Sequence, residues 1–141
     1  MEKEELNHYE ALNVLIIDDQ PMVHDTLKST LYDLGIRNIK FAENAYYGLR
    51  LCEQTRFHVV ICAFNVKSDK DGFHLLEELK FKGHVSKRTV LIFLSAETDE
   101  SLVNSIVELQ PDDFWVKPLS PAQVNKRLPH VLEVKKKLYN V

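Results

Sequence analysis

Residues 14–19 read VLIIDD, a short apolar run that ends in two carboxylates. The run is too short for a helix and is rich in β-branched residues, which is typical of a strand buried on both faces of a parallel sheet. Two other runs share this character, and two weaker segments resemble it: Val59–Cys62 and Val90–Leu94, then Asn38–Phe41 and Asp113–Val116. The sequence therefore predicts a parallel sheet built from these segments.

Helical periodicity fills the stretches between the predicted strands. Apolar residues recur at helical spacing in the segments Val23–Leu34, Ala45–Cys52, Leu75–Leu79, Leu102–Leu109 and Val124–Leu138. Gly35 is placed to end the first of these helices, and Pro129 predicts a kink or break near residues 125–129 in the last. This alternation predicts an α/β fold, a flavodoxin-like (βα)5 doubly wound parallel sheet with strand order 2-1-3-4-5.

Length and composition predict a single domain. The chain has 141 residues, of which 45% are hydrophobic and 28% charged. A chain of this kind can bury a core of its own, which excludes whole-chain disorder and a disulfide scaffold. We predict a polar tail over residues 1–11, the domain over residues 12–128 and a C-terminal helical extension over residues 129–141.

Charge and cysteine content narrow the classes of partner. The formal net charge of -3 lacks the basic footprint of a nucleic-acid-binding domain, and Lys135–Lys137 is interpreted as a solvated helix end. Cys52 and Cys62 lie in apolar stretches and are interpreted as buried free thiols, which fits a reducing compartment. No signal peptide or membrane-length apolar run is visible, so a cytoplasmic location without membrane contact is expected.

Polar residues follow the predicted strands at the edge where such sheets bind ligands. Asp18 and Asp19 follow the first strand, and two interpretations of the pair stay open. One carboxylate caps the helix that begins at Gln20-Pro21, or the pair binds Mg²⁺, which prefers carboxylate oxygens.

Ser95 and Lys117 follow the fourth and fifth strands, at the same predicted edge. With a metal held by two carboxylates, a hydroxyl and an ammonium group together make a phosphoryl site. The metal would neutralise phosphate oxygens, while the lysine and the hydroxyl would bind others.

Four motifs carry a resemblance to a known family, in that family's order and spacing: Val14–Asp19, Asp71-Gly72, Leu94-Ser95-Ala96 and Val116-Lys117-Pro118. Over residues 13–128 the chain resembles the receiver domain of two-component response regulators. In that family an aspartate at the end of the third strand takes a phosphoryl group from a histidine kinase. The resemblance therefore implies phosphorelay signalling, with a sensor histidine kinase or a regulatory protein as partner.

The resemblance also implies roles for individual residues. Asp18 and Asp19 would bind Mg²⁺. Ser95 and Lys117 would sense the phosphate, and Phe114 on the fifth strand would change rotamer with it.

The chain departs from the family at the phosphoacceptor position. Counting forward from the third strand places Ala63 there, whereas counting back from Asp71-Gly72 places Phe64 there, because the loop is one residue longer than usual. Neither residue has a carboxylate, and an aspartyl phosphate needs a carboxylate nucleophile. In the forward register Asn65 would give its backbone carbonyl to the metal. We therefore expect no phosphoryl transfer here, and Mg²⁺ binding that is weakened or absent.

Two origins of Ala63 fit the sequence. It is either a change introduced into an ordinary receiver or a natural feature of a degenerate receiver that works without phosphate. The longer loop and the absence of the family's loop proline, with Lys67 near its place, favour the natural origin. Asp69 and Asp71 are poor substitutes for the acceptor, because loop carboxylates would not face the metal.

The expected function is a regulatory binding module without catalytic activity. The alternative is a phosphate-independent interaction or dimerisation domain of a larger regulator. A small phosphatase or flavin carrier is disfavoured, because the chain has no glycine-rich phosphate loop. The expected output surface, which could also mediate self-association, comprises the helix over 102–109, the strand over 113–116 and the helix over 124–138. On it, sheet packing and an interface role for Trp115 are both open.

Overall fold

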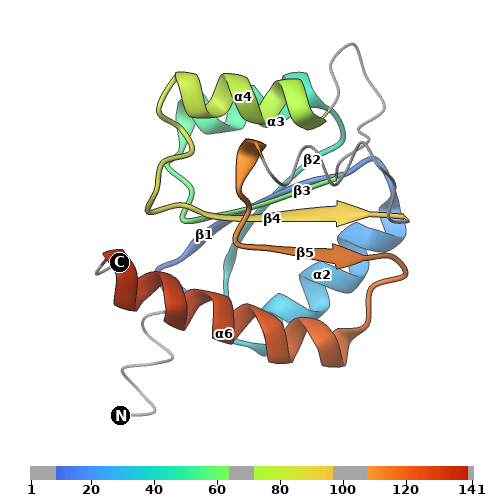
Figure 1. Ribbon diagram of the computed structural model, residues 1–141. Helices are drawn as coiled ribbons and strands as arrows, with labels where there is room; N and C mark the ends of the chain where they lie inside the picture. Colours follow the sequence, from blue (N-terminus) through green and yellow to red (C-terminus); the bar gives the residue numbers. More distant parts are fainter. Residues whose placement is uncertain (1–8, 64–71, 97–107, 140–141) are drawn as a thin grey trace.

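The computed structural model describes residues 9–63, 72–96 and 108–139, and it shows a parallel sheet between two layers of helices (Figure 1). The strand order is β2-β1-β3-β4-β5, and every neighbouring pair is parallel. The strands are β1 (Asn13–Ile17), β2 (Asn38–Ala42), β3 (Val59–Ala63), β4 (Val90–Ser95) and β5 (Asp113–Val116). The predicted doubly wound, flavodoxin-like sheet is confirmed.

Helices cover both faces of the sheet. They are α2 (Pro21–Asp33), α3 (Ala45–Gln54), α4 (Gly72–Phe81) and α6 (Pro121–Tyr139). Helices α3 and α4 pack side by side on one face, and α2 and α6 lie together on the other (Figure 1). Most of the helix predicted over residues 102–109 lies outside the described residues.

The core follows the apolar runs seen in the sequence. Every residue of β3 and β4 is buried, as are Val14–Ile17 of β1, whereas the edge strands β2 and β5 are partly exposed. Burial on both faces explains why the central strands read as continuous apolar runs rather than as alternating ones.

Two glycines are required by the backbone or by close packing. Gly35 has a φ of 103° and ends α2, with its N–H donating to Tyr32 O, as expected of a C-terminal cap. Gly48 brings α3 against β1, because a Cβ placed there would lie 2.8 Å from Cδ1 of Ile17.

Two expectations about the last helix, a break near Pro129 and the solvation of Lys135, are wrong. Helix α6 runs from Pro121 to Tyr139 without a break at Pro129. The carbonyl that proline leaves without a partner belongs to Asn125, an exposed residue, so solvent can satisfy it. Lys135 is not solvated either: it is buried and pairs with Asp112.

The predicted division at residues 128 and 129 falls inside this helix. None of the described helices combines the length and the apolar character needed to cross a bilayer.

Candidate functional site

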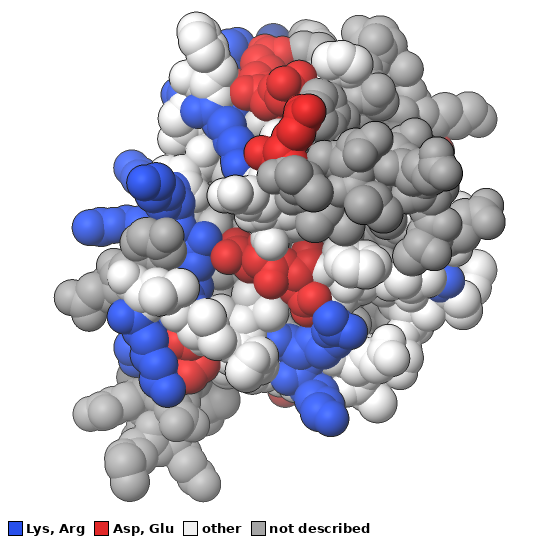
Figure 2. Space-filling view, in the orientation of Figure 1, with Lys and Arg blue, Asp and Glu red and all other residues white. Residues whose placement is uncertain are grey.

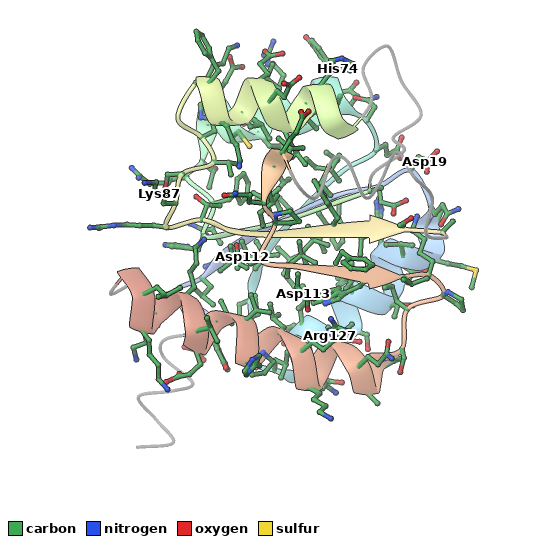
Figure 3. All side chains as sticks on the ribbon, viewed as in Figure 1. Asp19, His74, Lys87, Asp112, Asp113 and Arg127 are labelled. Atoms are coloured by element: carbon green, nitrogen blue, oxygen red, sulfur yellow. The ribbon has the colours of Figure 1, made fainter. Side chains whose placement is uncertain are left out.

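The strand register brings the predicted site residues to one edge of the sheet. The last paired residues are Ile17 with Cys62, Ala63 with Leu94, and Ser95 with Val116. Asp18 therefore follows β1 beside Ala63, which ends β3. Ser95 ends β4, and Lys117 follows β5. Asp19 lies at this edge in Figure 3, on the side to which the β4 and β5 arrows point.

Asp18 is the centre of this edge. Its side chain is completely buried, and its backbone N–H donates to Ala42 O across the β1–β2 pair. Oδ1 accepts a hydrogen bond of 2.8 Å from the Gln20 N–H, and Oδ2 lies 2.7 Å from the Lys117 ammonium. The buried carboxylate is thus neutralised from within the molecule.

Neither carboxylate of the pair caps helix α2. The N-cap residue is Gln20, which makes no side-chain capping bond, and Pro21 occupies the first turn. Asp18 instead holds the backbone just before the helix, and His24 Nε2 on the first turn lies 2.6 Å from Asp18 O. The capping interpretation of the acidic pair is therefore wrong.

Lys117 joins the ends of three strands. Its ammonium pairs with Asp18 and donates to Gln20 Oε1 at 3.0 Å, while its backbone N–H donates to Ser95 O at 2.7 Å. The Lys117–Pro118 peptide bond is cis. Gln20 is a member of the site that the sequence did not reveal. Its position directly after the acidic pair is the one signal that points to it.

The donor atoms fit Mg²⁺ in kind. Asp18 Oδ2 accepts no well-aligned hydrogen bond, although Lys117 lies within ion-pair distance, and the half-buried Asp19 is its neighbour in sequence. Carboxylate oxygens are the ligands that Mg²⁺ prefers.

The described side chains supply fewer ligands than Mg²⁺ needs to be held by the protein alone. No three His, Cys, Asp or Glu side chains of the described residues converge on one point. The predicted carbonyl ligand Asn65 lies outside the described residues, as do Asp69 and Asp71. Asp18 and Asp19 are the side chains that would hold the ion.

Among the residues described at the end of β3, neither Ala63 nor Cys62 offers a reactive nucleophile. Ala63 is buried and carries a methyl group. Its neighbour Cys62 is buried as well, with Sγ 3.4 Å from Ala63 O. Burial, and then the nearby Asp18 charge, raise the pKa of the Cys62 thiol far above its ordinary value. The thiol is therefore protonated and inert near neutral pH.

Beyond Lys117, strand β5 is tied to helix α6. The Asp113 carboxylate accepts from the Trp115 indole N–H at 2.9 Å and from Arg127 at 2.9 and 2.6 Å. Trp115 is buried, which confirms its packing role, and the predicted switch residue Phe114 is half-buried against the core. A shift of β5 would therefore be felt by α6.

Comparison with known proteins identifies the family. A family profile described as response regulator receiver domain matches residues 14–129. The chain belongs to this family. Receiver domains interact with histidine kinases or other regulators and typically bind Mg²⁺, so the coarse function is that of a receiver in a two-component response regulator.

Curated relatives place this receiver domain among signalling proteins. A probable chemotaxis protein CheY of Rhizobium etli is 29% identical over 111 residues, covering 79% of this chain and 84% of the relative. The response regulator RR06 of Streptococcus pneumoniae is 26% identical over 117 residues, covering 83% of this chain and 51% of that protein. The transcriptional regulatory protein AruR of Pseudomonas aeruginosa is 27% identical over 124 residues, covering 84% and 48%. The chain thus spans about half the length of the last two.

Solved structures agree with the fold. The chemotaxis response regulator CheY4 of Vibrio cholerae superposes with a TM-score of 0.76 at 25% identity, covering 86% of this chain and 98% of that one. The signal receiver domain of an HD domain-containing protein from Pseudomonas fluorescens gives a TM-score of 0.77 at 23% identity, covering 89% and 98%. The second likeness supports the fold alone.

Proposed function

We propose that this receiver domain is a regulatory binding module that takes no phosphoryl group at the end of β3. The observation that carries the proposal is the register, which sets Ala63 beside Asp18 at the edge where Ser95 and Lys117 also lie. Ala63 is then the degenerate acceptor, and an alanine methyl cannot attack phosphorus. The domain has no catalytic activity of its own.

The state of Lys117 supports the same proposal. In a phosphorylated receiver this lysine would pair with the phosphate, whereas here its ammonium already pairs with Asp18 and Gln20. The pair balances the buried Asp18 charge with a residue of the edge itself, so this arrangement needs no bound phosphate for its charge balance. Mg²⁺ binding by Asp18 and Asp19 is correspondingly weak, since one carboxylate ligand is absent.

The partner in this proposal is a sensor histidine kinase or another regulatory protein in the cytoplasm. It docks on the surface of β5 and α6, where Val116 and Val134 are exposed. The same surface would serve a second copy of the chain. Sedimentation of the purified chain across a range of concentrations tests this self-association. A monomer at every concentration would refute it, and docking to a different protein would then be the role of the surface.

The test of the missing acceptor is intact mass after incubation with acetyl phosphate and Mg²⁺. We expect no phosphoryl adduct on the chain as given. Ala63→Asp is the informative variant, because it restores a carboxylate beside Asp18. Ala11→Asp, at an exposed position just before β1 and so at the opposite edge of the sheet, is the matched control that adds a carboxylate away from the end of β3.

Two outcomes support the proposal and one overturns it. A phosphoryl adduct on Ala63→Asp alone would show that a single residue silences a competent pocket. No adduct on any variant would show that the whole edge has lost the chemistry, and the phosphate-independent module stands. An adduct on the chain as given would refute the proposal and direct attention to Asp69 or Asp71.

A further inference from the structure

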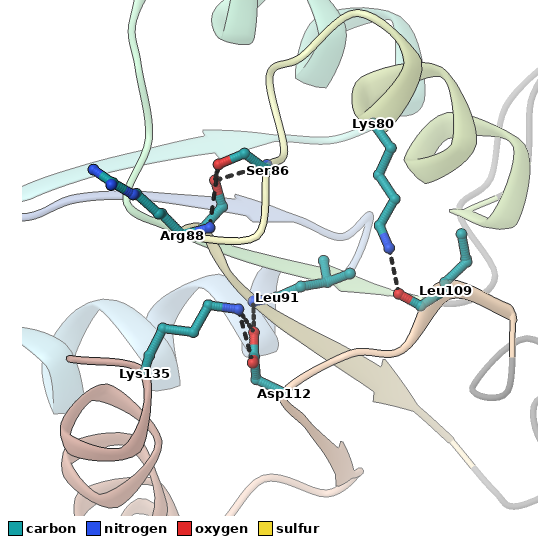
Figure 4. A network of polar contacts seen from close by, with 8 residues as sticks. Lys80, Ser86, Arg88, Leu91, Leu109, Asp112 and Lys135 are labelled. Atoms are coloured by element: carbon teal, nitrogen blue, oxygen red, sulfur yellow. Dashed lines mark hydrogen bonds and ion pairs between the residues drawn. The ribbon is translucent and has the colours of Figure 1, made fainter. Parts of the chain in front are cut away.

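A cavity of about 360 Å³ lies at the opposite edge of the sheet, where β4 and β5 begin. The end of α4, the loop before β4 and the end of α6 surround it. In Figure 3, Lys87 marks this edge and Asp19 marks the other. Figure 4 shows Lys80 and Lys135 reaching toward this region from different helices. The cavity is therefore separate from the site around Asp18.

The cavity carries an excess of positive charge. Its lining contains three ammonium groups, those of Lys80, Lys87 and Lys135, against the single carboxylate of Asp112. Basic side chains gather on this flank of the molecule in Figure 2, beside a central acidic patch. Two positive charges in the lining are thus left without an acidic partner there.

The Asp112 carboxylate is already engaged. Its oxygens lie 3.0 and 3.2 Å from the Lys135 ammonium, and Oδ2 also accepts a hydrogen bond of 2.8 Å from the backbone N–H of Leu91. These contacts, shown in Figure 4, fix the carboxylate against α6 and β4. Its charge also favours the charged form of Lys80, but less strongly than burial and the Lys135 charge oppose it, so the pKa of Lys80 is still lowered.

Lys80 and Lys87 are the two cations of the lining for which the described residues show no ion pair with Asp112. The Lys80 ammonium donates to a neutral acceptor, the Leu109 carbonyl, and its pKa is lowered by burial and then by the charge of Lys135. Within the described part of the chain Lys87 makes no ion pair. A bound anion would relieve the repulsion between Lys80 and Lys135.

The backbone of the cavity wall is strained at one residue. Gln110 has a φ of 49°, in the left-handed region that residues other than glycine rarely adopt. Strain of this kind concentrates at ligand-binding and switch segments, where the surrounding structure maintains it. The strained residue and the charge excess are independent observations on the same cavity.

We propose that this cavity binds an organic anion with two or more acidic oxygens. Lys80 and Lys87 would bind the oxygens, and the apolar wall formed by Val85, Leu91 and Leu138 would contact the organic part. The volume is within the range of small-molecule sites. The proposal concerns a different edge of the sheet from the proposed function and does not depend on it.

The test is titration of the whole chain with ATP and, separately, with inorganic pyrophosphate at low ionic strength. Binding is followed by calorimetry and by amide NMR shifts. We expect saturable ATP binding with shifts centred on Leu91 and Gln110. Lys80→Gln and Lys87→Gln should each weaken it by about fivefold or more, because each removes one charge-assisted hydrogen bond.

Lys126→Gln is the matched control, since Lys126 is exposed on α6 and does not line the cavity. It should leave binding unchanged, and circular dichroism checks that each variant is folded. Tighter binding of ATP than of pyrophosphate supports a contact between the apolar wall and the organic part of the ligand. Equal binding of the two probes overturns the proposed contact with the organic part. Equal weakening by all three variants, or the absence of saturation with both probes, overturns the site itself.

Discussion

The Asp18 carboxylate is completely buried at the end of β1, so its charge must be balanced inside the molecule. Lys117 provides the balance, with 15% of its side chain exposed. Removing one partner of a buried pair costs more than the pair itself contributes, because the remaining charge stays in a poorly hydrated place. Loss of Lys117 should therefore lower the stability of the fold more than loss of Asp18, because it leaves the buried carboxylate without a counter-charge.

Lys117→Met is expected to lower the free energy of unfolding by roughly 3 kcal/mol. Urea unfolding followed by circular dichroism measures the change. Asp18→Asn introduced into Lys117→Met should recover part of the loss, because a neutral amide needs no counter-charge. Lys126→Met, at an exposed position, should stay within about 0.5 kcal/mol of the parent. A Lys117→Met protein as stable as the parent would contradict this account of the ion pair.

For single residues, the sequence predicts which edge of the sheet a side chain lies on better than it predicts which side chains are in contact. Asp18 and Lys117 were expected at one edge because parallel strands that begin together also end together. The contact of Lys117 with Gln20 was missed, since it joins residues 97 positions apart and depends on side-chain rotamers. Strand order cannot supply that information.

Among the elements, α3 and β1 show how closely a helix can approach the sheet. Gly48 faces Ile17, and a Cβ would lie 2.8 Å from its Cδ1 and 3.2 Å from its Cγ1. Ile17 is fully buried, so it has little space into which to move. A larger residue at this helix position would therefore push α3 outward or strain the isoleucine.

Gly48→Ala is expected to lower the free energy of unfolding by about 1 kcal/mol. Overpacking of roughly 2 kcal/mol is partly offset by the better helix propensity of alanine, about 1 kcal/mol. Thermal unfolding of the two proteins gives the comparison. In an Ile17→Val background, which removes Cδ1, Gly48→Ala should become neutral or stabilising. The same penalty in both backgrounds would mean that Ile17 is not the obstacle.

Helix α6 keeps its helical period as far as its C-terminal lysines. Lys135 comes eleven residues after Val124 on the stripe that also holds Leu128 and Val131, so the helical pattern itself places it on the buried face. The charged cluster Lys135–Lys137, taken by itself, predicts solvent exposure instead. Its partner Asp112 lies on the segment before β5 and could not be identified from the pattern, because pairing across the fold requires the packed geometry.

In the molecule as a whole, the two buried cysteines make the stability of the fold depend on pH. Burial, with a smaller contribution from Glu53, raises the pKa of Cys52 from 9.0 to about 12, and burial raises that of Cys62 further. In the unfolded chain both thiols ionise near their ordinary pKa. The protonated form is thus favoured by the fold, so this contribution is complete below about pH 9 and is lost as the pH rises toward 12.

The free energy of unfolding should therefore fall between about pH 9 and pH 12, by up to roughly 1.4 kcal/mol per pH unit for each thiol. Urea unfolding at a series of pH values measures the slope. Cys52→Ala combined with Cys62→Ala should make the slope shallower, while tyrosine ionisation contributes equally to both proteins. An identical slope in the double variant would show that the thiols are not responsible.

The order of the whole sheet was predictable because short apolar runs, helical stripes and right-handed crossovers leave few arrangements. The same patterns could not reveal the cavity between α4 and α6. Lys80, Lys87 and Lys135 belong to three separate segments, and only the packed sheet brings them together.

The contacts of Lys117 also set an order for biosynthesis. Asp18 and Gln20 leave the ribosome before their partner Lys117, which lies nearly a hundred residues further along the chain. Until β5 has been translated, a nascent chain that closes its first strands holds an acidic group without its cation. The residue that follows the fifth strand of this sheet therefore completes the charge balance at the end of the first.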